Sequence, residues 1–136
     1  SISIPFQDSL DISLLNSDKI FTYDSETQEW LINYGPYEQI QELNPIKGYL
    51  VYSDEYQTLT LSGFDFNLMI EPPTNWRLEG VTLGNNDTPI EEVYGQGYQV
   101  YGWTGSEYIE LTSSDLHVGE AYWIAPDYIL SPPPDF

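Results

Sequence analysis

The feature that most constrains the fold of this chain is a unit that the sequence contains twice. In each copy an aromatic hairpin leads through a loop to an aromatic strand. Tyr23 and Trp30 match Tyr101 and Tyr108 at one offset, 101 − 23 = 78 and 108 − 30 = 78, which predicts two hairpins that align without a gap. Such a unit is too small to bury its apolar residues alone, so we expect the two copies to share a core.

Two further pairs of matching segments, one after the hairpin and one before it, occur in the same order in both copies. Gly48-Tyr-Leu-Val51 matches Ala121-Tyr-Trp-Ile124 at 122 − 49 = 73, so the loop before this strand is 78 − 73 = 5 residues shorter in the second copy. Upstream, Ser3-Ile-Pro-Phe6 matches Gly80-Val-Thr-Leu83 at 80 − 3 = 77. Three anchors in one order predict a duplication and a pseudo-two-fold arrangement.

Short runs of alternating apolar and polar residues, broken by Gly and Pro, are typical of β-strands. We therefore expect an all-β fold, an antiparallel β-sandwich or barrel built from two pseudo-symmetric repeats. One or two short helical turns are predicted, within residues 8–15 and 89–94. The chain is expected to form a single domain, divided into repeat 1 at about 1–63, a connecting strand and proline-rich joint at 64–75, repeat 2 at about 76–130 and a tail at 131–136.

Three motifs carry a family resemblance: Trp76-Arg-Leu-Glu-Gly-Val81, Phe21-Thr-Tyr-Asp24…Trp30 and Leu43-Asn-Pro-Ile-Lys-Gly-Tyr49. They resemble the W-N-L, Y-D…W and G-Y-W patterns of tandem β-rich repeats in bacterial and archaeal extracellular multidomain surface proteins. The first copy lacks the leading Trp, and the second has Gly102 for the Asp and Ala121 for the second Gly. The resemblance implies a structural or interaction role at the cell surface or outside the cell, with no catalytic residues.

The net charge of the chain excludes some classes of binding partner. Asp and Glu number 22 against 3 Lys and Arg, a net charge of −19, so phosphate backbones are repelled and nucleic acid is excluded as a partner. No apolar run approaches the ~18 residues of a membrane span, so we expect no membrane insertion. The absence of cysteine excludes thiol catalysis and Cys-based zinc sites. What this charge attracts is cations.

Calcium is the one cofactor that the sequence suggests, because it prefers carboxylate, amide and carbonyl oxygens. Two turns offer such groups, and ordinary polar turns are the alternative for both. The candidate ligands are Asn85, Asp87, Glu91 and Glu92 in one turn, and Asp24 and Glu26 in the other.

The aromatic residues suggest a glycan as a second kind of partner, since Trp and Tyr faces stack on sugar rings and the same residues fill β-cores. Trp30, Trp76 and Trp123 occupy repeated strand positions and are predicted to be core. Trp103 falls outside that pattern. It is the predicted ligand contact, together with Tyr101 and Tyr108.

The N-terminal residues Ile2, Ile4 and Phe6 alternate like a strand that pairs with its own sheet or with another copy of the chain. We expect a non-enzymatic extracellular structural or interaction module, either a surface-protein domain or a self-assembling filament or layer subunit. Its partners would be other copies of itself or neighbouring surface domains. A carbohydrate-binding module is the alternative, and a glycoside-acting enzyme, which needs two facing carboxylates, comes third.

Overall fold

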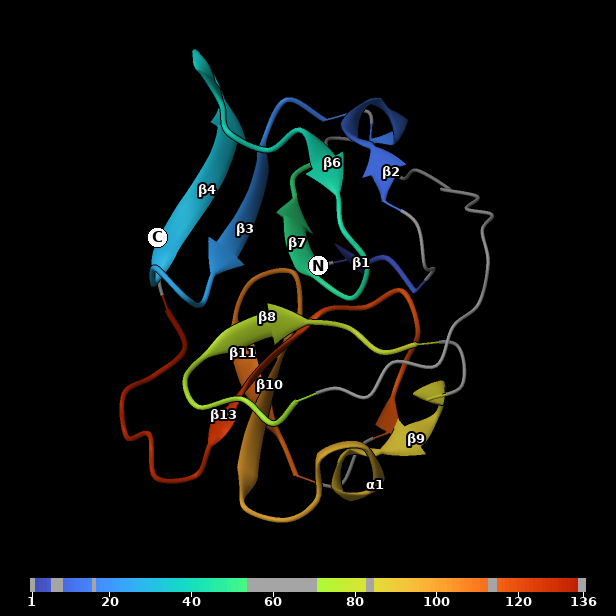
Figure 1. Cartoon of the computed structure of the whole chain (residues 1–136), viewed down its shortest axis with the longest axis vertical. Coiled ribbons are helices and arrows are strands. Elements are labelled where there is room, and N and C mark those ends of the chain that lie inside the picture. The colour runs from blue at the N-terminus through green and yellow to red at the C-terminus, as the bar shows by residue number, and fades with distance from the viewer. Residues whose placement is uncertain are drawn as a thin grey trace.

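Two antiparallel sheets, one from each half of the sequence, lie one above the other along the longest axis of the molecule (Figure 1). The computed structural model describes residues 2–5, 9–15, 17–53, 71–82, 85–112 and 115–134. Phe6, the end of the predicted repeat 1 from residue 54 onward and the predicted connecting strand up to residue 70 lie outside these residues.

The first sheet has the order β1-β7-β3-β4-β5 and the second the order β11-β10-β13-β8. Two short ladders pair β2 with β6 and β9 with β12. The first-half strands are β1 (Ile2–Ser3), β2 (Leu10–Asp11), β3 (Ile20–Asp24), β4 (Glu29–Tyr34), β5 (Tyr37–Glu38), β6 (Glu42–Leu43) and β7 (Gly48–Val51). The second-half strands are β8 (Arg77–Glu79), β9 (Thr88–Pro89), β10 (Tyr98–Trp103), β11 (Tyr108–Leu111), β12 (Asp115–Leu116) and β13 (Tyr122–Pro126).

The two helical pieces are short, as the sequence predicts. A 3-10 turn covers Ile12–Leu14, and its N-cap is Asp11, whose carboxylate accepts the Ser13 N–H at 2.8 Å. The helix α1 covers Ile90–Tyr94 and follows Pro89, whose fixed φ suits a helix start. The predicted all-β antiparallel fold is confirmed.

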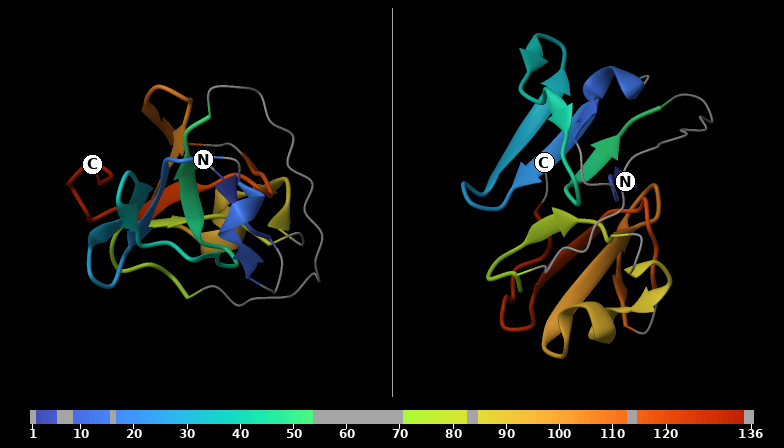
Figure 2. Two further views of the ribbon diagram at one scale, coloured as in Figure 1. Left: turned by 90° about the horizontal axis from the view of Figure 1, so that it is seen from above. Right: turned by 45° about the vertical axis from the view of Figure 1, so that its right-hand side comes forward.

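The order β1-β7-β3-β4 in the first sheet corresponds to β8-β13-β10-β11 in the second. One local detail recurs at the predicted offset of 73. The Tyr49 hydroxyl accepts the Asn44 N–H at 2.7 Å, and the Tyr122 hydroxyl accepts the His117 N–H at 2.9 Å. The halves thus use the same strand order and the same tyrosine bond to hold the loop before the strand. The right view of Figure 2 shows the first-half strands above those of the second half.

The two hairpins differ in register. Tyr23 lies opposite Trp30 in the first hairpin, whereas Trp103 lies opposite Tyr108 in the second. The counterpart of Tyr23 is therefore Trp103, at 103 − 23 = 80, and not Tyr101 at 78. The gapless alignment of the hairpins is wrong by two residues in β10.

The turn explains this difference. The first hairpin leaves residues 25–28 in its loop. In the second, the Thr104 N–H bonds the Glu107 carbonyl at 3.0 Å, so the turn contains only Gly105 and Ser106. Gly105 has φ of +101°, which a two-residue hairpin turn favours and which a glycine adopts without strain. A shift of two residues keeps each side chain on its original face, so the pattern of buried residues survives it.

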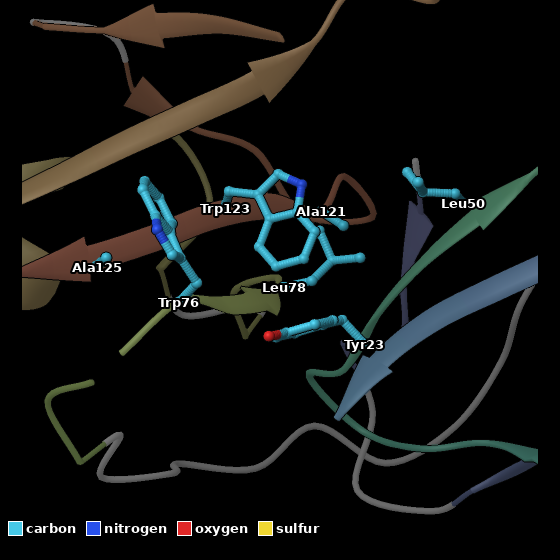
Figure 3. Packing of buried hydrophobic residues seen from close by; sticks show 7 residues of the cluster. All are labelled: Tyr23, Leu50, Trp76, Leu78, Ala121, Trp123 and Ala125. Carbon is cyan, nitrogen blue, oxygen red and sulfur yellow. The ribbon is translucent and has the colours of Figure 1, made fainter. Parts of the chain in front are cut away.

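The buried apolar residues that the structure describes form three clusters. One lies within each half, around Tyr49 in the first and Tyr122 in the second. The third, the shared aromatic cluster, joins the halves and comprises Tyr23, Leu50, Trp76, Leu78, Ala121, Trp123 and Ala125. Figure 3 shows these side chains pointing from the two sheets into the same space. Trp76 and Trp123 are buried and Trp30 packs against the cluster, as the repeated positions predict.

Two backbone hydrogen bonds connect the halves at corresponding positions. Ser3 N–H donates to the Gly119 carbonyl at 2.8 Å, and Gly80 N–H donates to the Ile46 carbonyl at 2.6 Å. Ser3 and Gly80 are related by the offset of 77, and Ile46 and Gly119 by 73. Gly80 has no room for a side chain, because a Cβ there would overlap the Ser3 side chain and lie 2.8 Å from the Glu120 carbonyl oxygen.

We expect Gly80→Ala to lower the free energy of unfolding by about 1–3 kcal/mol, the usual cost of overpacking a close contact. Urea denaturation followed by tryptophan fluorescence measures it. Gly102→Ala is the matched control, since its Cβ would meet only the flexible end of Leu111, at 3.3 Å. Adding Ser3→Gly to Gly80→Ala should restore part of the loss. Equal stability of the two alanine variants would contradict the close approach of the halves.

Candidate binding groove

An open groove of about 990 Å³ lies where the first sheet meets the second hairpin. One wall comes from β3, β4 and the end of β7, and the other from the β10–β11 hairpin and residues 120–122. The groove residues on which the proposals depend are Lys19, Tyr34, Tyr52, Ser53, Trp103, Thr104 and Glu120.

Trp103 is the exposed ring of the second hairpin. It lies at the end of β10 and is 38% exposed. Its ring centroid is 4.8 Å from that of Tyr108, which in turn meets Trp123 edge-on at 6.3 Å. Trp103 is therefore held by the shared aromatic cluster and still presents ring surface to the groove. Its counterpart Tyr23 is buried in that cluster.

The other two predicted ligand contacts have different surroundings. Tyr101 is half-buried and packs against Trp76, with ring centroids 5.7 Å apart. Tyr108 is also half-buried and supports Trp103 from beneath. Neither of them lines the groove. The predicted aromatic trio therefore presents Trp103 alone to a groove ligand.

The first sheet contributes three groove residues that the sequence analysis missed. Tyr34 and Tyr52 are 50% and 51% exposed. The ammonium of Lys19 lies 5.0 Å from the Tyr34 ring centroid and 4.7 Å from the Tyr52 ring centroid. The three residues are neighbours across the sheet because Ile20 pairs with both Asn33 and Val51, which places Lys19 next to Tyr34 and Tyr52. Strand pairing brings these three residues together. They lie far apart in the sequence, so no local sequence pattern predicts that they are neighbours.

A second, polar pocket of about 470 Å³ lies beside β8 and includes Arg77 and Glu79. Burial raises the pKa of Glu79, although Arg77 and the hydrogen bonds from Tyr94 and Arg77 act to lower it. Glu79 Oε1 accepts from the Tyr94 hydroxyl at 2.8 Å and from Arg77 Nη2 at 3.0 Å. Burial and the Glu79 charge raise the pKa of Tyr94 well above its ordinary value. The Tyr94–Glu79 hydrogen bond joins α1 to β8, so we assign these residues a structural role.

The candidate calcium ligands lie in turns whose hydrogen bonds are made within the protein. Asp24 accepts the Glu26 N–H at 3.0 Å, and Asp87 Oδ1 lies 2.7 Å from His117 Nδ1. Asn85 donates its backbone N–H to the Thr82 carbonyl. Glu91 and Glu92 lie exposed in the first turn of α1. Within the described ranges no three carboxylate or histidine side chains come together as a metal site. Calcium binding stays a prediction.

The N-terminal strand pairs within its own chain. Ile2 lies opposite Tyr49 and Ser3 opposite Gly48, while Ile4 is fully buried in the first-half cluster. Phe6 lies outside the described residues. Of the two arrangements considered for this strand, the structure shows pairing with its own sheet.

Comparisons of the chain with protein-family models, with curated proteins and with solved structures found no match. The resemblance to tandem surface repeats therefore stays a prediction. Among the residues that the structure describes, no helix is long and apolar enough to cross a membrane.

Glu79→Gln should remove one contribution to the pH dependence of the free energy of unfolding. Because the pKa of Glu79 is raised in the folded state, the folded chain holds this proton more tightly than the unfolded chain. The stability that this proton binding gives is complete below the ordinary pKa of 4.5 and is lost as pH rises through the folded pKa. The free energy of unfolding of the natural protein, minus that of Glu79→Gln, should thus fall from pH 4 upward.

Urea denaturation at a series of pH values measures this difference. Tyr94→Phe should move the fall to higher pH, since it removes a hydrogen bond that lowers the pKa of Glu79. A difference that stays constant or increases with pH would contradict the burial argument.

Proposed function

We propose that this chain is a non-enzymatic extracellular interaction module that binds a glycan in the groove, with Trp103 as the ring on which a sugar stacks. The observation that carries the proposal is the exposed Trp103 ring in the lining of the groove. Tryptophan combines a large apolar face with a rigid side chain, so it contributes contact area at little cost in conformational entropy.

The remainder of the groove suits such a ligand. Ser53 and Thr104 are polar residues in its walls, and the Thr104 hydroxyl is held in the β10–β11 turn, where it donates to the Glu107 carbonyl at 3.1 Å. Sugar sites combine aromatic surface with a few polar groups that fix orientation.

Assembly with other copies or with neighbouring surface domains is the alternative proposal. Ile2 and Ile4 would then pair with another chain. In this structure β1 is bonded on one side to β7 and on the other to Gly119, so a partner strand would have to displace one of these. Glycan binding needs no such rearrangement, and the geometry supports it better.

We expect Trp103→Ala to weaken glycan binding at least tenfold, about 1.4 kcal/mol, because the stacking surface is lost. An array of neutral and acidic oligosaccharides finds the ligand, and calorimetry measures its affinity. Tyr128→Ala is the matched control: Tyr128 is 71% exposed and does not line the groove. Circular dichroism checks that both variants fold. Equal affinities of the Trp103 and Tyr128 variants, or no binding to any glycan, would refute the proposal.

A further inference from the structure

The ammonium of Lys19 is held in one place at the groove wall. Lys19 immediately precedes β3, and its carbonyl accepts the Tyr52 N–H at 3.0 Å. The Tyr34 and Tyr52 rings on the two neighbouring strands lie within about 5 Å of Nζ. A cation near aromatic faces is attracted by the negative potential of each ring. The rings accept no strong hydrogen bond, so the three N–H donors of the ammonium remain for acceptor oxygens.

Lys19 makes the groove unlike the rest of this acidic chain. It is one of only 3 basic residues against 22 acidic ones. Arg77 pairs with Glu79, yet across the part of the chain that the structure describes, no carboxylate lies within 4.0 Å of Lys19 Nζ. Among the described residues that line the groove, Glu120 supplies the one carboxylate, and its Oε2 accepts the Tyr122 hydroxyl at 2.8 Å. Within that part of the chain, the Lys19 ammonium thus faces a groove with few negative groups.

The second half shows that the fold does not need this arrangement. Strand pairing identifies Gln99 as the counterpart of Lys19. Gln99 lies opposite Ala125 in the second sheet, and Lys19 lies next to Tyr52 at the corresponding position of the first sheet. Gln99 Nε2 donates to the carbonyls of Pro126 at 2.9 Å and Ile129 at 2.7 Å, and so holds the segment after β13. The tyrosine–lysine–tyrosine set therefore occurs in one half only, at positions where the other half has a structural residue.

We propose that the groove selects a sugar that bears a carboxylate, a uronate, whose carboxylate binds the Lys19 ammonium while a ring of the same glycan stacks on Trp103. This inference rests on the proposed glycan binding and narrows its ligand class. A charge-assisted bond to a carboxylate is stronger than one to a neutral hydroxyl. The distant carboxylates of the chain do not forbid an anionic ligand, because charges beyond about 8 Å are largely screened at physiological salt.

The test compares acidic oligosaccharides with their neutral methyl esters, which have the same rings. Three probe pairs are used: oligomers of galacturonate, glucuronate and mannuronate, each with its fully methyl-esterified form. We expect the natural protein to bind the acid form of at least one pair about tenfold more tightly than the ester. Lys19→Gln should remove this preference and leave affinity for the ester unchanged, and Lys19→Arg should keep the preference.

Lys47→Gln is the matched control, because it changes the net charge by the same amount at a residue outside the groove. It should keep the preference for the acid. Equal binding of acid and ester in all three pairs, or a preference that survives Lys19→Gln, overturns this inference and leaves glycan binding to be judged by Trp103→Ala. No binding to these probes or to any array glycan overturns both proposals.

Discussion

The packing of Trp123 against rings from both halves is the interaction on which the rest of the structure depends. Its centroid lies 5.2 Å from Tyr23, 5.7 Å from Trp30, 6.3 Å from Tyr108 and 6.4 Å from Trp76, each in an edge-on arrangement. Burying one aromatic side chain removes roughly 150–250 Å² from water, worth about 4–6 kcal/mol at ~25 cal/mol per Å². Within the described residues neither buried indole N–H, of Trp76 or Trp123, finds an acceptor, so packing alone holds them.

The same junction generates the groove, because the two halves differ there. A two-residue turn in the second hairpin moves β10 by two positions and places Trp103 where the first half has the buried Tyr23. On the opposite wall the first half has Lys19 where the second has Gln99. The groove residues proposed to contact the glycan and the uronate, Trp103 and Lys19, thus lie at positions where the two halves differ.

How far the candidate site could be predicted differs from residue to residue. Trp103 could be singled out because it falls outside the repeated strand positions of the other tryptophans and lies beside Gly102 and Gly105. Tyr101 and Tyr108 were chosen with it for proximity in sequence, yet their side chains meet the shared aromatic cluster. Lys19, Tyr34 and Tyr52 could not be found, because the pairing of three strands brings them together.

The sequence by itself determined the two hairpins, the aromatic strand that follows each of them and the burial of the repeated tryptophans, because alternation and duplication are local patterns. Tertiary structure decided the register of the second hairpin, because the two-residue turn sets which residues pair and the alignment of aromatic residues does not. It also decided the approach of Gly80 to Ser3 and the position of the Lys19 ammonium. These depend on which residues face each other across strands and between halves, and a linear pattern does not contain that information.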